Sequence, residues 1–207
     1  WIRKDTVWHV NPTGKFYIIE PSFWGGGKMP GLEIANEEKL MLPGSFIVEP
    51  PNGDPNQYPE RPHLVHLPKL GAAPRDFEEL ASKWIVSEHL KGVFESVDPD
   101  AFAFAACDFT QADGTPGPAY YLCNVVRTLD ALDEQASRLK IKIGDYVNGK
   151  YYSLAGGANL IFKDEVIGSA HVFRTPFADT VFCDRALYDA VNAAHLRGVG
   201  FLDAAEC

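Results

Sequence analysis

Apolar residues occur along the chain in short runs separated by polar residues, and this pattern predicts a fold with more strand than helix. Nine runs of four to nine residues carry the β-branched, aromatic or alternating pattern typical of strands, and most are bounded by Gly, Pro, Asn or Asp. They are residues 16–20, 45–49, 63–66, 101–109, 120–126, 140–143, 151–154, 159–163 and 171–175. Helical spacing is weaker. It occurs around residues 37–42, in the segment after Ser87, and at 186–197, where Gly198 fits a left-handed cap.

Two segments 97 residues apart share one pattern, an apolar pair followed by a helix and a strand. Ser87 and Asp184 stand at equivalent positions, and both residue types accept hydrogen bonds from the free amides of a first helical turn. The apolar stripe of the first helix recurs in the second, and two strand positions recur beyond it: Leu90, Val93, Phe94, Phe102 and Phe104 match Leu187, Ala190, Val191, Val199 and Phe201. We expect two similar strand–helix–strand units, each helix resting on a sheet. Both a duplication and convergent local patterning account for the similarity.

Two stretches are too rich in Gly and Pro for regular structure, and we expect them to be loops. Residues 50–62 hold five prolines, and residues 21–31 hold three consecutive glycines between prolines. The glycines are followed by Lys28, but Met29 stands where a phosphate-binding loop needs Ser or Thr, so phosphate binding is not expected. Trp24 in this loop either folds back as a plug or is exposed as an anchor for a partner.

The 207 residues suffice for one well-buried core, and the hydrophobic share of 46 % is ordinary for a globular protein. We therefore predict an α+β (mixed α/β) fold in a single domain over residues 16–207, with a mixed or antiparallel sheet and a few packed helices. Residues 1–15 are expected to be an N-terminal arm. No apolar run approaches the roughly 20 residues that a membrane helix needs, so no membrane partner is expected.

The net charge of −9 argues against a nucleic-acid partner, because phosphates are bound by clustered Lys and Arg, and no such cluster occurs. An acidic protein meets a basic partner faster, although many cytosolic proteins are equally acidic. Four cysteines, three of them in apolar runs, show no metal-binding spacing and suggest a reducing compartment. A cytoplasmic location is expected. No signal peptide is seen, although the printed chain begins at Trp1.

No pattern typical of a catalytic, cofactor or metal site is present. The serines after Gly44 and Gly168 lack the second glycine of a nucleophile elbow, and no dinucleotide-binding G-x-G-x-x-G follows a strand. His63 and His66 would point to opposite faces of a strand, which does not favour a shared metal ion. We assign no catalytic, cofactor-binding or metal-binding residue, and expect no enzyme activity.

The acidic stretch that follows the run at 120–126 is the most distinctive charged segment. It is rich in helix formers, and Arg127 at its start is expected to reach the carboxylates of Asp130 or Glu134. One interpretation is a strand with a solvated acidic edge that fixes the arginine. The other is a charged surface offered to a partner, and for this we name Asp130, Asp133 and Glu134, together with Trp24.

Four blocks in a fixed order carry a family resemblance: WIVSEHLKGVFESVDPDAFAF, YYLCNVVRTLDALDEQASR, GSAHVFRTPF and LRGVGFLDAA. The chain resembles the Imm11 family of bacterial immunity proteins over about residues 16–205. The resemblance implies an immunity protein that binds and neutralises a cognate secreted toxin inside the producing cell. It supplies no catalytic motif. An acidic inhibitor would suit a basic toxin.

Two alternatives remain open at the level of the sequence. The first is a small enzyme whose site is assembled from distant residues, for instance His171 or His195 with an aspartate. The second is a small-ligand-binding module with an apolar pocket around Phe23 and Trp24.

Overall fold

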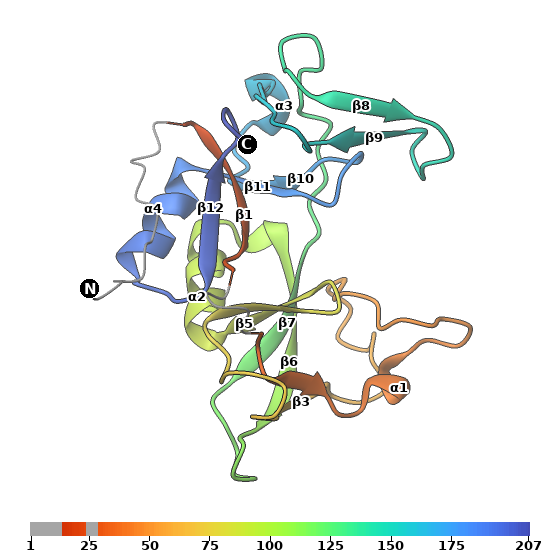
Figure 1. The fold of residues 1–207 in the computed structure, drawn as a ribbon, viewed down its shortest axis with the longest axis vertical. Helices are drawn as coiled ribbons and strands as arrows, with labels where there is room; N and C mark the ends of the chain where they lie inside the picture. The colour runs from red at the N-terminus through yellow and green to blue at the C-terminus, as the bar shows by residue number, and fades with distance from the viewer. Residues whose placement is uncertain (1–13, 24–28) are drawn as a thin grey trace.

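The computed structural model describes residues 14–23 and 29–207, which form three β-sheets and a few short helices (Figure 1). The largest sheet has six strands, and all its pairs are antiparallel except β3 with β6. In spatial order the strands are β2 (Leu32–Ile34), β3 (His63–His66), β6 (Phe102–Thr110), β7 (Tyr120–Val125), β5 (Lys83–Ser87) and β4 (Phe77–Leu80).

The second sheet has four antiparallel strands, and the third is a two-stranded hairpin that stands away from the rest of the molecule (Figure 1). The four-stranded sheet has the order β10 (Val172–Arg174), β11 (Val181–Asp184), β1 (Phe16–Pro21) and β12 (Val199–Asp203). The hairpin consists of β8 (Lys140–Ile143) and β9 (Lys150–Ser153), which we call the hairpin arm. Its turn contains the pair Asn148-Gly149, a dipeptide that is common in hairpin turns.

Among the described residues, helices are fewer than strands, and only α2 and α4 are longer than one turn, so the predicted α+β class with a mixed sheet is confirmed. The two longer ones, α2 and α4, contact each other, and each also packs on its own sheet. The helical elements are α1 (Glu37–Leu40), α2 (Glu88–Val97), the 3-10 turn η2 (Pro99–Ala101), α3 (Asp164–Ile167) and α4 (Arg185–Ala193). The proposed division into an arm and one domain stays a prediction, and residues 1–13 lie outside the described residues.

The two expected strand–helix–strand units are present and share one topology. In the first, β5–α2–β6, both strands pair with β7 between them; in the second, β11–α4–β12, both pair with β1. The middle strand is antiparallel to its neighbours in each case. The two middle strands differ in origin, however, since β7 follows its unit along the chain and β1 precedes its unit. A duplication therefore stays a hypothesis.

Both helices begin as the sequence predicts. The Ser87 hydroxyl accepts a hydrogen bond from the Leu90 amide, at 3.2 Å, and an Asp184 carboxylate oxygen accepts one from the Ala186 amide, at 2.9 Å. These bonds satisfy amides that have no partner within the helix. The predicted stripes are buried, at Leu90 and Phe94 in α2 and at Leu187 and Val191 in α4. The stripes meet in one core between the six-stranded and four-stranded sheets.

Several predicted elements are wrong. Residues 45–49 form no strand, and the Phe46 side chain is 93 % exposed, because no neighbouring strand offers hydrogen bonds there. Residues 159–163 make only isolated bridges. The last helix ends at Ala193, and the first left-handed residue after it is His195, with a φ of 53°. Gly198 also has a positive φ, of 88°, but lies beyond the end of the helix, and a Cβ there would lie 2.6 Å from the carbonyl oxygen of Phe77.

Candidate partner-binding surface

The acidic stretch after β7 is extended and not helical, which corrects the expectation of helix. Its backbone bonds go to other segments: the Leu129 amide donates to the Arg174 carbonyl and the Asp133 amide to the Ile161 carbonyl, both at 2.8 Å. Ala131 and Leu132 are buried in a second core under the four-stranded sheet. Tertiary contacts thus override the helix propensity of the segment.

The three acidic residues of this stretch have different roles. The Asp133 carboxylate accepts bonds from two amides of the following turn, at 3.0 Å each. The Glu134 carboxylate binds Lys150 and the Tyr152 hydroxyl of β9, and the bond from Lys150 holds its pKa below the ordinary value. Asp130 is exposed, and within the described part of the chain its carboxylate makes no ion pair or hydrogen bond. Asp130 is therefore the member of the set whose charge is available to a partner.

Arg127 does not bind the acids of its own segment, which corrects the second expectation. Its guanidinium pairs with the buried carboxylate of Asp98, just after α2. The same carboxylate oxygen accepts bonds from the amides of His171 and Val172, at 2.8 and 3.0 Å. This cluster ties the end of α2 to β10, and Arg127 serves the fold.

Trp24 lies outside the described residues, so its assignment as a partner contact stays a prediction. The residues that border residues 24–28 on either side, Phe23 and Met29, are both exposed. Neither lines either of the two cavities described below.

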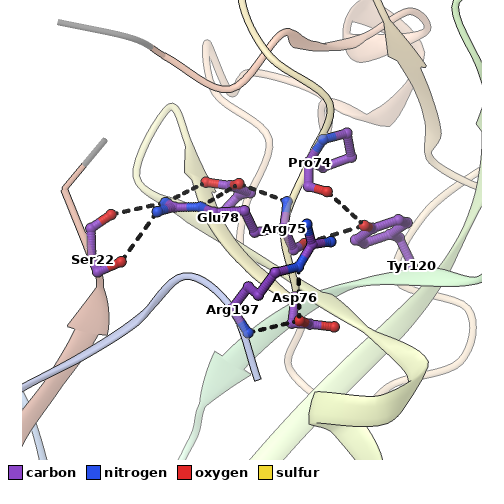
Figure 2. A network of polar contacts seen from close by, with 7 residues as sticks. All are labelled: Ser22, Pro74, Arg75, Asp76, Glu78, Tyr120 and Arg197. Carbon is purple, nitrogen blue, oxygen red and sulfur yellow. Dashed lines mark hydrogen bonds and ion pairs between the residues drawn. The ribbon is translucent and has the colours of Figure 1, made fainter. Parts of the chain in front are cut away.

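A polar junction holds the two larger sheets together (Figure 2). Arg75 donates to both carboxylate oxygens of Glu78, at 2.9 Å each, and Glu78 is only 1 % exposed. The same guanidinium donates to the hydroxyl and the carbonyl of Ser22, at 3.1 and 2.8 Å, just past the end of β1. Figure 2 shows the guanidinium between Ser22 and Glu78. This charge pair links β4 of one sheet to β1 of the other.

Further bonds around the junction fix the segment before β12. The Asp76 carboxylate accepts bonds from the Ser87 hydroxyl, at 2.9 Å, and from the Arg197 amide, at 2.8 Å. The Tyr120 hydroxyl donates to the carbonyls of Pro74 and Arg75, and burial raises its pKa to about 12. Most polar groups of the junction bind one another, so the junction is structural.

A groove of about 420 Å³ lies where the three sheets approach one another. It is lined by residues from β1, β4, β5, β9, β11 and β12 and from the segments beside them: Ile18, Ile19, Glu20, Glu79, Trp84, Tyr151, Leu154, Asp179, Thr180, Val181, Leu202 and Cys207. We call it the three-sheet groove. Its wall combines apolar side chains with three carboxylates that are far apart in sequence.

Sequence reasoning missed these carboxylates. Glu20 lies near the end of β1, Glu79 lies in β4 and Asp179 precedes β11, and no spacing in the sequence links them. Burial raises the pKa of Glu20, and the negative charge of Glu79 raises it further. The Glu79 carboxylate is therefore close enough to Glu20 to act on its charge across the groove.

The His171–Asp184 pair and three of the cysteines lack the setting of catalytic groups. His171 Nδ1 lies 2.7 Å from an Asp184 carboxylate oxygen, as the enzyme alternative would require, but Asp184 caps α4 and the pair lines neither cavity. Burial raises the pKa of the Cys107 thiol to about 12, and it raises the pKa of Cys123 and Cys183 as well. A thiol that stays protonated is a poor nucleophile.

The described residues contain neither a cluster of metal ligands nor a helix that could cross a membrane. Over residues 14–23 and 29–207, no cluster of three or more His, Cys, Asp or Glu side chains has the arrangement of a metal site. A second, apolar cavity bordered by Leu132, Tyr152 and Leu160 has a volume of about 10 Å³, too small for an organic ligand. Within the same residues, the structure has no helix with the length and hydropathy needed to cross a bilayer.

Comparison with protein families gives the class of this chain. The model of the immunity protein family Imm11 matches residues 15–206, nearly the whole length. The chain belongs to the Imm11 family of immunity proteins, as the order of its sequence blocks predicted.

Comparison with curated proteins adds only a short similarity. The chain is 76 % identical over 21 residues to an S-adenosylmethionine synthase of Bradyrhizobium sp. (strain ORS 278), and 71 % identical over 21 residues to the synthase of Bradyrhizobium sp. (strain BTAi1 / ATCC BAA-1182). The similarity covers 10 % of this chain and 5 % of each synthase. A segment of this length carries neither a fold nor an activity.

Proposed function

We propose that this protein neutralises a cognate secreted toxin by binding it tightly in the cytoplasm of the cell that produces both. The observation that carries this proposal is the match of the Imm11 family model to residues 15–206. Inhibition by binding requires a complementary surface and no reactive group, and this agrees with the structural use of the Asp184 carboxylate and the burial of three thiols.

The charge of the protein supports a basic partner. A net charge of −9 attracts a positively charged protein over several ångströms and raises the rate of encounter. A stable complex buries about 1,200–2,000 Å² in total, with a few aromatic or charged residues supplying most of the affinity. Asp130 is the best placed of the predicted contacts, because its carboxylate is exposed and makes no ion pair or hydrogen bond within the described residues.

Titration of toxin activity separates binding from catalysis. The toxin to use is the one encoded beside the gene for this chain, purified and assayed with increasing amounts of immunity protein. Binding predicts that inhibition is complete at one equivalent and does not deepen with time. Complete inhibition by a small fraction of an equivalent, growing with incubation, would instead identify an enzyme that modifies the toxin or its target. No inhibition at any ratio would refute both mechanisms.

Charge reversal at Asp130 tests the acidic stretch. Asp130→Lys is expected to weaken toxin binding without lowering the free energy of unfolding, because the carboxylate has no partner within the described residues. Asp133→Asn and Glu134→Gln are the appropriate companions, since lysine at either position would also disturb the turn or the contact with β9. Unchanged affinity in Asp130→Lys would remove this stretch from the interface.

A further inference from the structure

The three-sheet groove brings three carboxylates from distant segments into one wall. Within the described residues, the carboxylates of Glu20, Glu79 and Asp179 form no ion pair and accept no hydrogen bond. The neighbouring residue on β4, Glu78, is by contrast paired with Arg75 in the polar junction. Consecutive strand residues point to opposite faces, so β4 directs one charge into the core and the next into the groove.

Positive charge also lies near the groove, and Lys142 of β8 provides part of it, with its Nζ 6.0 Å from the centre of the Tyr151 ring. Arg174 of β10 lies close enough to Asp179 for the two charges to interact, although the two side chains form no ion pair within the described residues. Burial is the main cause of the raised pKa of Glu20, and the negative charge of Glu79 adds to it, so the two like charges oppose each other. A cation placed between these two would relieve their repulsion, so the groove is electrostatically complementary to a basic group.

The apolar part of the groove wall is rich in rings. Trp84 of β5 forms part of the wall, and Tyr151 of β9 forms another part. Tyr151 also stacks on Tyr146, at 5.6 Å between ring centroids, so the wall continues onto the hairpin arm. Beyond it the arm exposes Ile143, at 78 %, and Val147, which is fully exposed. Rings beside carboxylates suit an arginine, whose planar guanidinium both stacks and pairs in a bidentate manner.

We propose that the three-sheet groove is the docking site for an arginine-bearing segment of the cognate toxin, and that the hairpin arm covers the apolar part of that segment. The proposal rests on the proposed function and names the surface that carries it out. A second copy of this chain is a poor occupant, because a protein of net charge −9 repels itself at an acidic groove.

The first experiment compares two triple variants that each remove three negative charges. The groove variant is Glu20→Gln, Glu79→Gln and Asp179→Asn. The control variant removes three exposed carboxylates outside the groove, which make no ion pair within the described residues: Glu38→Gln, Asp100→Asn and Glu165→Gln. The affinity of each for the toxin encoded beside the gene is measured by calorimetry at two salt concentrations.

The groove variant is expected to bind the toxin about tenfold to a hundredfold more weakly than wild type, and the control variant within about threefold of it. Equal weakening in both variants would show that net charge and not the groove attracts the toxin, and would overturn the inference. Wild-type affinity in the groove variant would overturn it as well, while leaving the immunity function intact. A wild-type protein that binds no toxin would refute the proposed function itself.

The second experiment identifies the occupant. Each exposed arginine of the toxin is changed to glutamine, and binding is measured against both wild type and the groove variant. One arginine is expected to lose its contribution when the groove carboxylates are absent, which is the signature of direct coupling. If every arginine contributes equally in both backgrounds, no arginine occupies the groove. Thermal unfolding of the groove variant verifies that the fold is retained.

Discussion

The polar junction between the two larger sheets allows a sharp test of what stabilises the fold. We predict that Glu78→Gln destabilises the protein strongly, because it removes the charge that faces Arg75 at a site where Glu78 is 1 % exposed and the Arg75 side chain 13 %. A glutamine has one acceptor oxygen, so one of the Arg75 N–H groups would face an N–H of the amide. The guanidinium would remain largely buried without the carboxylate.

The magnitude follows from the burial of the pair. Removing one partner of a buried charge pair costs about 3–5 kcal/mol, and glutamine should fall at the lower end because it keeps the shape and one acceptor. We expect a loss of about 3 kcal/mol and a fall in melting temperature of roughly 10 °C. Urea unfolding followed by tryptophan fluorescence measures the free energy, and near-ultraviolet circular dichroism verifies the native packing.

A matched control separates burial from charge. Arg61 and Asp108 also form an ion pair, at 3.3 Å, but both side chains are more than half exposed. Asp108→Asn should therefore cost less than about 1 kcal/mol. If Glu78→Gln costs no more than this control, the pair between Arg75 and Glu78 does not hold the sheets together, and our interpretation of the junction is wrong.

Four further predictions concern single positions. Ser87→Ala should lower the free energy of unfolding in urea by about 1 kcal/mol, because α2 loses its cap. Gly198→Ala should lower it by more than about 2 kcal/mol, because the new Cβ would clash with the Phe77 carbonyl. Wild-type stability in either variant would contradict the role given to that residue. Glu20 has a raised pKa in the folded state, so its ionised form destabilises the fold. In calorimetry, Glu20→Gln should therefore raise the melting temperature at pH 7 by on the order of 1 °C. Well below pH 4.5, where Glu20 is protonated in both states, the melting temperature should not change. Cys207 is the one thiol that is not fully buried, and a thiol reagent should modify it first in the native protein.

The parts of the fold that sequence predicted well are those fixed by local chemistry. Ser87 and Asp184 cap their helices because a short polar side chain at that position has a free amide within reach. The strands on either side of the turn that ends at Gly149 pair as a hairpin, and Gly149 takes the positive φ, 77°, that a glycine adopts without strain. The apolar stripes of α2 and α4 are buried for the same reason, since their spacing matches one face of a helix.

The failures are places where distant segments decide the outcome. Residues after Arg127 favour a helix by composition, yet Ala131 and Leu132 are drawn into the second core, and their backbone bonds go to other segments. Arg127 has acidic neighbours in sequence but pairs with Asp98, which lies 29 residues earlier. No local signal identifies such a partner.

The groove shows the same limit for function. Its carboxylates come from three segments, and each is an ordinary surface acid when seen in sequence. Their convergence follows from the approach of β1, β4 and the segment before β11, which only the tertiary structure reveals. The acidic stretch could be recognised in the sequence because its charges lie close together. Within the described part of the chain, however, Asp130 is its one residue whose carboxylate makes no ion pair or hydrogen bond.

The place of β1 at the centre of the four-stranded sheet bears on when the protein becomes functional. The two strands that flank it, β11 and β12, are translated long after it, so β1 has no neighbours in its sheet until they emerge. At common translation speeds this delay is roughly 10–40 seconds. Until then the three-sheet groove lacks the walls that β11 and β12 provide, so the docking site proposed above can form only after β12 has been made.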